Sequence, residues 1–433
     1  VEAVLDPDFD EAGFDGILRT VVGDDDVPAP NILGPDLLAR ALAAGTNITL
    51  STQVFGLDDA DEAGNIVVTD GFTISTDDVL SGTRATLTLL AANDIEINDP
   101  LGVVAGSDPN DRFELSVVLR ANDLAQSAPT GGPFDLDRTE GGVTIAADVS
   151  TGGGDFRAQG SFIELQTGRT IDTDGGLVDL RSGLIDRNGT PTTLASRGGD
   201  PRLEDRVDPV GRAPDLTIDG LIDSRCSGSC ASDAVGGDIR MIASSIGVRE
   251  GGGNAPIDVI TGRLRLGASG ALQSGGGDIQ LTGGSSAQGS AVPFAGSIDL
   301  QGPIASEGGN VSVVASRIDP DQGVDGASVR FIEPDPAAPV LRGEGGEISA
   351  RGPITTEGGT LSFGGDLTRS VILDGLFDTT VADDSDNGLF RVIARDLASR
   401  NESADLFGNG TIAIGSRAAT TIRSAGIKLE ARD

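Results

Sequence analysis

The chain has 433 residues, and its 67 acidic against 31 basic residues give a formal net charge of −36. So acidic a surface repels nucleic acid and anionic membranes, and we expect no basic patch that could release counterions from a polyanion. Histidine, tyrosine and tryptophan are absent. Because histidine is the commonest general base and metal ligand, we predict that the chain is not an enzyme.

Apolar residues make up 38% of the chain and occur in short, regularly spaced clusters of Ile, Val and Leu. This pattern predicts a folded protein in spite of the high charge. Only 3% of the residues are aromatic, and all of these are Phe. The core is therefore expected to be thin and aliphatic, as in the narrow interior of a β-helix.

The first 34 residues are acidic and rich in turn-forming residues, with Asp24, Asp25 and Asp26 ahead of a proline-rich stretch. They predict an extended arm or linker, and residues 35–433 form the second region. Residues 35–44 are the one convincing short helix, because Pro35 suits a first helical position and Gly45 suits a left-handed end. We expect this helix to cover one open end of the fold.

From Thr46 onward the pattern is short strand, turn, short strand. Segments of aliphatic and β-branched residues are bounded by Gly, Asn and Asp, and include 47–50, 65–68, 85–89, 94–97 and 143–145. Gly-Gly pairs recur between them, for example at 153–154, 276–277, 308–309 and 358–359. Such pairs suit corners that need positive φ.

The clearest internal repeat pairs residues 296–313 with residues 346–363. Each block reads as strand, Gly-Pro corner, strand, Glu-Gly-Gly corner, strand, and Ile304 and Ile354 occupy equivalent inward positions. A repeat of this length is typical of solenoids, in which each coil buries its apolar face against its neighbours. The fold class predicted is therefore all-β, a right-handed parallel β-helix with loop excursions. Those loops are expected at 186–214, around the cysteines, and at 318–341.

Runs such as 42–52, 64–68, 85–98 and 141–155 resemble the filamentous-haemagglutinin-like large exoproteins of two-partner secretion. The resemblance covers most of residues 36–433 and carries no catalytic motif. It implies an exported β-helical stalk or adhesin at the bacterial cell surface.

Two kinds of candidate site remain. Cys226 and Cys230 are the only cysteines, and too few ligands for structural zinc are present, so a short-range disulfide is favoured over two free thiols. Two acidic runs are weak calcium candidates, although neither has the spacing of an EF-hand loop. Their candidate ligands are Asp58, Asp59, Asp61, Asp383, Asp384 and Asp386. The alternative interpretation is ordinary solvated turns, and no other cofactor is expected.

These observations predict an extracellular structural or adhesive protein that forms a rigid stalk on the bacterial surface, on the order of 100 Å long if each coil takes about 20 residues. The alternative is a self-assembling subunit of an extracellular filament or sheath, and a less favoured one is a β-helical polysaccharide-degrading enzyme. Expected partners are its own copies end to end, the rest of a longer exoprotein, or molecules of a host or neighbouring cell surface. Neither nucleic acid nor membrane insertion is expected.

Overall fold

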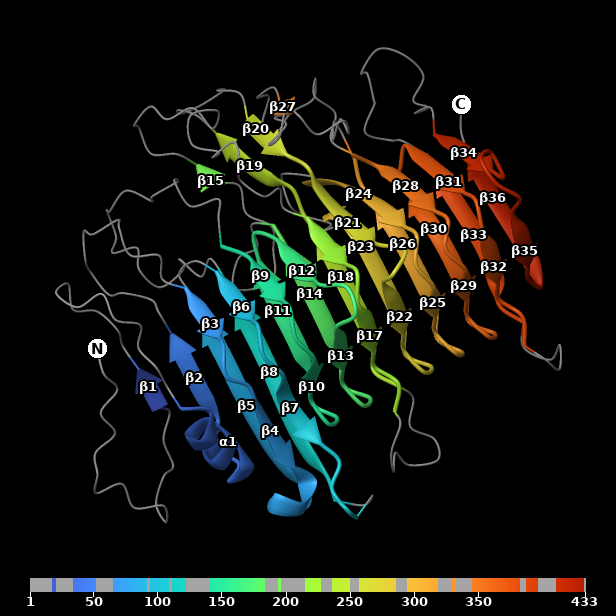
Figure 1. Cartoon of the computed structure of the whole chain (residues 1–433). Coiled ribbons are helices and arrows are strands. Elements are labelled where there is room, and N and C mark those ends of the chain that lie inside the picture. The colour runs from blue at the N-terminus through green and yellow to red at the C-terminus, as the bar shows by residue number, and fades with distance from the viewer. Residues whose placement is uncertain are drawn as a thin grey trace.

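The computed structural model describes residues 18–20, 34–51, 65–91, 94–108, 111–121, 141–183, 194–195, 215–226, 236–249, 257–285, 294–317, 329–331, 345–381, 387–395 and 410–431. Within them the chain winds through three parallel sheets, one strand per sheet in each turn (Figure 1). The predicted parallel β-helix with a short N-terminal capping helix is confirmed.

Each complete coil passes from sheet B to sheet C to sheet A. Sheet B contains β3 (Ile66–Val68), β6 (Ile95–Ile97), β9 (Val143–Ile145), β12 (Ile163–Leu165), β16 (Leu216–Ile218), β21 (Gly262–Leu266), β24 (Phe294–Leu300), β28 (Glu347–Ala350), β31 (Ser370–Leu373) and β34 (Thr411–Ile414). Sheet C contains β4 (Phe72–Ser75), β7 (Leu101–Val104), β10 (Val149–Ser150), β13 (Thr170–Asp172), β17 (Leu221–Asp223), β22 (Ala271–Gln273), β25 (Ile304–Ala305), β29 (Ile354–Thr355), β32 (Leu376–Asp378) and β35 (Thr421–Arg423).

Sheet A is the longest of the three. It contains β1 (Leu18–Thr20), β2 (Ile48–Ser51), β5 (Thr83–Leu90), β8 (Phe113–Arg120), β11 (Phe156–Gly160), β14 (Val178–Ser182), β18 (Ile239–Ala243), β23 (Ile279–Ser285), β26 (Val311–Ala315), β30 (Leu361–Gly365), β33 (Leu389–Ala394) and β36 (Gly426–Ala431). Strand β1 lies inside the predicted arm and pairs in parallel with β2.

The core is a set of aliphatic columns that run along the axis. In sheet C, Ile304 pairs with Ile354 in the next coil, and both side chains are fully buried. The predicted repeat holds on all three faces, because Ile298 pairs with Ile348 and Val311 pairs with Leu361. Near the C-terminal end three phenylalanine rings pack together in the core, with 5.6 Å between the centroids of Phe363 and Phe377 and 5.9 Å between those of Phe377 and Phe390.

The length predicted for the rod is wrong by about a factor of two. A short coil does take 20 residues, as from Val143 to its partner Ile163. The coil from Ile163 to Leu216, however, takes 53 residues, because a long excursion interrupts it. Strands stacked about 4.8 Å apart along sheet A give a rod of about 50 Å.

One end of the stack is covered by helix α1 (Pro35–Ala43). Leu42 is fully buried, and Leu38, Ala39 and Ala41 pack against the same core. The helix lies beside β4, which is the edge strand of sheet C (Figure 1). It therefore shields apolar side chains that the first coil would otherwise expose.

The corner between sheets C and A repeats a Ser/Thr-x-Gly-Gly sequence. The hydroxyl is buried and donates to the carbonyl of the second glycine, as from Ser306 Oγ to Gly309 O at 2.5 Å. The same bond is made by Thr151, Thr173, Ser274 and Thr356. Each hydroxyl thus replaces water at a buried turn carbonyl.

The glycines of this corner have two different roles, whereas the sequence predicts only positive φ. At the corner of β25 and β26, Gly308 has φ 114° and the residue before it, Glu307, has φ 51°. Gly309 is needed for a different reason, since a Cβ there would lie 2.0 Å from Gly277 O. Gly309 belongs to a glycine column. The column consists of glycines 154, 176, 237, 277, 309, 359 and 388, and a Cβ on any of them after the first would lie within 2.4 Å of the carbonyl oxygen of the previous one.

The last coil is less covered than the others. Ile427 and Leu429 of β36 are 56% and 49% exposed, whereas their partners Phe390 and Val392 in β33 are fully buried. Both positions belong to inward columns of sheet A. No strand of the described chain lies beyond β36.

Candidate interaction surfaces

Most of the long connections leave the stack at one corner, between sheet A and sheet B. Connections from sheet B to sheet C are short, such as residues 166–169 between β12 and β13. Those from sheet A to sheet B include residues 183–215 and 316–346, which cover the predicted loops at 186–214 and 318–341. Connecting loops carry binding functions more often than the elements that they join. This corner is named the loop ridge.

Three connections of the loop ridge pair with one another. Strand β19 (Ile246–Arg249) pairs in parallel with β15 (Leu194–Ala195) and antiparallel with β20 (Ile257–Ile260). Strand β20 then pairs in parallel with β27 (Val329–Phe331). Figure 1 shows these strands beside the main stack. Segments far apart in the sequence thus form a small side sheet that sequence periodicity does not predict.

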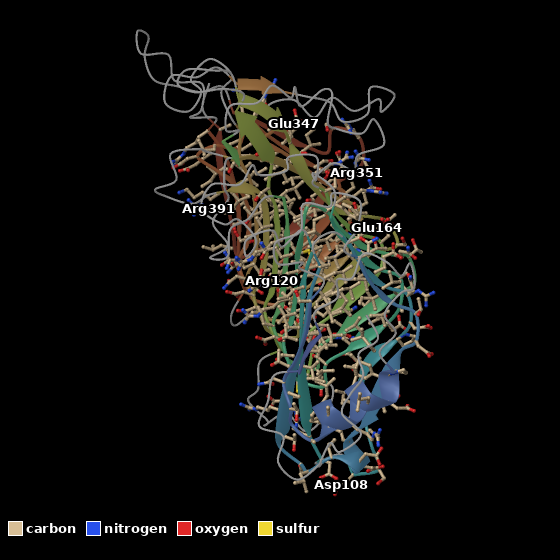
Figure 2. The ribbon with its side chains drawn as sticks, turned by 90° about the vertical axis from the view of Figure 1, so that its left-hand side faces the viewer. Asp108, Arg120, Glu164, Glu347, Arg351 and Arg391 are labelled. Carbon is tan, nitrogen blue, oxygen red and sulfur yellow. The ribbon has the colours of Figure 1, made fainter. Side chains whose placement is uncertain are left out.

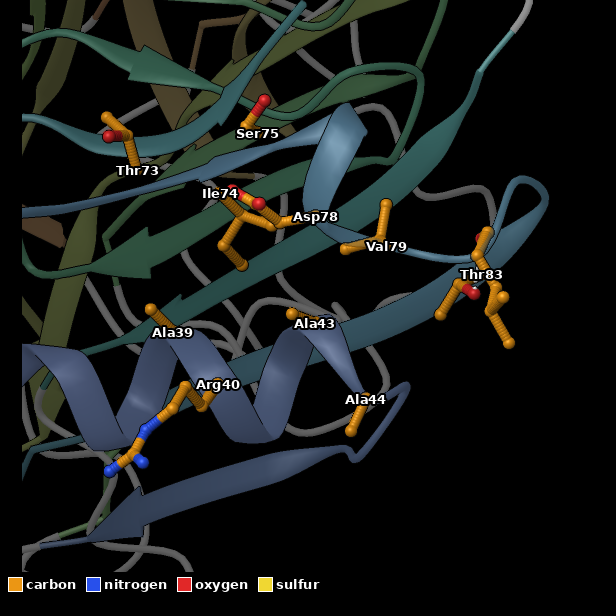
Figure 3. Close-up of a pocket in the computed structure, with 11 residues that line it drawn as sticks. Ala39, Arg40, Ala43, Ala44, Thr73, Ile74, Ser75, Asp78, Val79 and Thr83 are labelled. Atoms are coloured by element: carbon orange, nitrogen blue, oxygen red, sulfur yellow. Dashed lines mark hydrogen bonds between the residues drawn. The ribbon is translucent and has the colours of Figure 1, made fainter. Parts of the chain in front are cut away.

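A shallow recess of about 460 Å³ lies between α1 and the corner after β4 (Figure 3). Its lining is mainly apolar, with Ala39, Ala43, Ile74 and Val79, and the charged groups at its border are Arg40 and Asp78. Catalysis by paired acids or by a nucleophile and base needs such groups within hydrogen-bonding reach of each other. The recess lining contains a single carboxylate, that of Asp78, so it offers no pair of acids.

The calcium candidates Asp58, Asp59, Asp61, Asp383, Asp384 and Asp386 lie outside the described residues. Within the described part of the chain, no group of three acidic or sulfur ligands is placed to hold a metal ion. No described helix is long and apolar enough to cross a membrane.

Cys226 forms a disulfide bond. Cys230, the other cysteine of the predicted pair, lies outside the described residues. The bond belongs to an excursion inserted in a Ser/Thr-x-Gly-Gly corner. Ser224 Oγ still donates to Gly237 O at 2.6 Å, so the corner survives the insertion.

The corner between sheets C and A is acidic, and we name it the acidic ridge. Its carboxylates include Asp155, Asp172, Asp174, Asp223, Asp238, Asp278, Glu307, Glu357 and Asp378. Arginines neutralise part of it: Arg225 Nη2 donates to Asp223 Oδ2 at 2.7 Å, and Arg225 Nη1 lies 3.8 Å from Glu307 Oε1. Arg157 and Arg423 pair with Asp155 and Asp378.

Burial raises the pKa of the Asp172 carboxyl, and the backbone hydrogen bond from Asp174 opposes this effect. The neighbouring carboxylates of Asp223 and Asp174 raise the pKa further. At Asp378, burial acts to raise the pKa, but hydrogen bonds from Thr380 and Arg423 outweigh it and lower the pKa. The ridge is therefore acidic without being electrostatically uniform.

The outer face of sheet A, in contrast to the acidic ridge, is basic. Outward basic side chains outnumber outward acidic ones by seven to three; the basic ones are Arg84, Arg120, Arg157, Arg181, Arg240, Arg391 and Lys428, and the acidic ones are Glu114, Asp179 and Glu430. On the outer face of sheet B, Glu96, Glu164, Asp299 and Glu347 outnumber Arg263 and Arg265. Figure 2 shows Arg120 and Arg391 on the side of the ribbon opposite Glu164 and Arg351.

The sequence gives little sign of this basic face, because its arginines lie 20 or more residues apart and are separated by acidic turns. Only the register of sheet A brings them together. The expectation that no basic patch exists is therefore wrong for this face.

Comparisons with protein-family models, curated proteins and solved structures find no match for this chain.

Proposed function

We propose that this chain is a structural and adhesive rod of an extracellular bacterial surface, in which the β-helix is the stiff support and the loop ridge makes contacts. The observation that carries the proposal is the separation of the two parts. A continuous stack supplies stiffness through its buried columns, while the long connections concentrate at one corner and leave the register of the stack intact.

The disulfide of Cys226 supports an oxidising, extracellular location. The resemblance of the sequence to filamentous-haemagglutinin-like exoproteins supports the same proposal. The runner-up is a filament subunit, in which the exposed last coil stacks on another copy. Two features favour the rod over that alternative: α1 covers the first coil at sheet C, and β1 occupies the edge of sheet A. Both stand where an incoming copy would stack.

Electron microscopy of the purified chain, with and without residues 1–34, tests the proposal. Discrete rods of about 50 Å in both samples support the rod. Long regular fibres from the full chain would favour the filament subunit. Binding of the intact chain to bacterial or host cell surfaces, lost when residues 186–214 and 318–341 are replaced by short linkers, supports adhesion through the loop ridge.

A further inference from the structure

Three arginines on the outer face of sheet A have no ion-pair partner among the described residues: Arg120, Arg240 and Arg391. The other basic groups of this face are engaged. Arg84 lies 2.8 Å from Glu114, Arg157 lies 2.8 Å from Asp155, and Arg181 lies 2.6 Å from Asp179. Lys428 lies 3.1 Å from Glu430. The chain has a net charge of −36, and these three arginines form no ion pair with the described part of the chain that would stabilise the stack. Their role is therefore sought outside the fold.

Arg240 and Arg391 stand on one straight column. The register runs from Arg240 to Gln280, Ser312, Ser362 and then Arg391. Four coils of about 4.8 Å place the two guanidinium groups about 19 Å apart along the axis. The side chains between them, Gln280, Ser312 and Ser362, are neutral and polar, and no aromatic side chain points outward there. The column is thus a flat hydrogen-bonding track with a cation at each end.

From this geometry we propose that the outer face of sheet A binds a linear polysaccharide that carries carboxylates, lying along the rod axis. Guanidinium groups bind carboxylates through two parallel hydrogen bonds, and Arg is preferred over Lys where such pairing matters. The neutral track offers hydroxyl and amide groups to the sugar hydroxyls between two charged contacts. The proposal rests on the function of a surface rod and names its ligand class.

The shape of the surroundings favours a thin polymer over other polyanions. The acidic ridge borders sheet A along one side, and it repels any wide anion that spreads beyond the column. A second copy of this chain, with its own net charge of −36, would bring two acidic ridges together. Single-stranded nucleic acid binds through base stacking on aromatic side chains, which this face lacks.

The test is binding of polygalacturonate to the purified full chain, measured by calorimetry at low ionic strength and at about 150 mM salt. The variant R240Q/R391Q removes both cations of the track. A matched control, R265Q/R351Q, removes the same charge from the sheet B side, where Arg351 is exposed and Arg265 lies 3.9 Å from Asp219. Circular dichroism and the thermal midpoint report whether each variant is folded.

We expect the intact chain to bind polygalacturonate more weakly as salt rises and to ignore neutral dextran. R240Q/R391Q should lose at least about fivefold in affinity, and R265Q/R351Q less than about twofold. Equal losses in the two variants, competition by dextran, or no binding at low salt would overturn the proposal. The proposal would also be overturned, in favour of another partner, by an intact chain that does not bind polygalacturonate but self-associates or binds single-stranded DNA, if R240Q/R391Q abolishes that interaction. None of these outcomes bears on particle shape in the electron microscopy experiment, so the proposed function is judged separately.

Discussion

A Cβ atom on Gly309 would lie 2.0 Å from the carbonyl oxygen of Gly277 in the preceding coil. The contact is with backbone, so it cannot be relieved by moving a side chain. We expect Gly309→Ala to lower the free energy of unfolding by more than about 3 kcal/mol. Gly168→Ala is the control, because its φ is 75° but no atom lies within 4 Å of its Cβ position. Its cost should be about 1 kcal/mol in urea denaturation. Equal costs would show that the glycine column is not a steric requirement.

The inward columns give a second prediction. Ile304 is 1% exposed, and its neighbour in sequence, Ala305, points outward. Ile304→Asp buries a carboxylate without a partner, and we expect a loss of at least about 4 kcal/mol or failure to fold. Ala305→Asp introduces the same group on the outer side and should cost less than about 1 kcal/mol. A comparable loss for both would contradict the inward assignment; chemical denaturation or soluble yield measures the difference.

The buried hydroxyls of the Ser/Thr-x-Gly-Gly corners give a third prediction. Ser306→Ala leaves the Gly309 carbonyl without the hydroxyl donor that it has in the native corner. We expect a cost of about 1 to 2 kcal/mol. Ser312, on the outer side of β26, is the matched control, and Ser312→Ala should change stability by less than about 0.5 kcal/mol. Thermal midpoints of the two variants provide the measurement, and a neutral Ser306→Ala would mean that water replaces the hydroxyl without penalty.

Asp172 gives a pH-dependent prediction. Because the folded state raises its pKa, the native protein holds this proton more tightly than the unfolded chain. Its contribution to stability is therefore fully present below the unfolded pKa and is lost as the pH rises through the folded pKa. Asp172→Asn should raise stability near neutral pH, and the gain should shrink as the pH falls toward about 4.

Urea midpoints across that pH range measure the Asp172 effect. Asp238→Asn is the control, because this residue is an exposed member of the same ridge whose Oδ1 accepts from Asp278 N. A gain that does not depend on pH would indicate a packing effect at Asp172 in place of a charge effect.

The fold could be predicted from sequence because its determinants are local and repeated. The match between 296–313 and 346–363 predicts that Ile304 and Ile354 are stacked, and they are. Helix α1 was predictable because Pro35 and Gly45 mark its two ends. The strands expected at 94–97 and 143–145 also appear as β6 and β9.

The surfaces could not be predicted in the same way, because they depend on which coils are neighbours. Arg240 and Arg391 are 151 positions apart in the sequence and four coils apart in the stack. The uneven length of the excursions hides this relation and also causes the overestimate of rod length. The hydroxyl bonds are an intermediate case, since their Ser/Thr-x-Gly-Gly signal is visible at 151–154, 173–176, 274–277, 306–309 and 356–359. Only the structure shows that the hydroxyl faces inward.

The bond from Ser224 to Gly237 has a practical consequence for engineering. In five of the seven described corners that make this bond the donor and acceptor are three residues apart, but here they are thirteen apart. Thr379 and Gly388 make the same bond at a separation of nine. The hydrogen bond between the two ends of the corner therefore forms whatever the length of chain between them. Foreign segments can be inserted at this position for that reason. A peptide epitope inserted between Glu307 and Gly308 would be displayed outside the rod, with the strands on either side held in their original pairing.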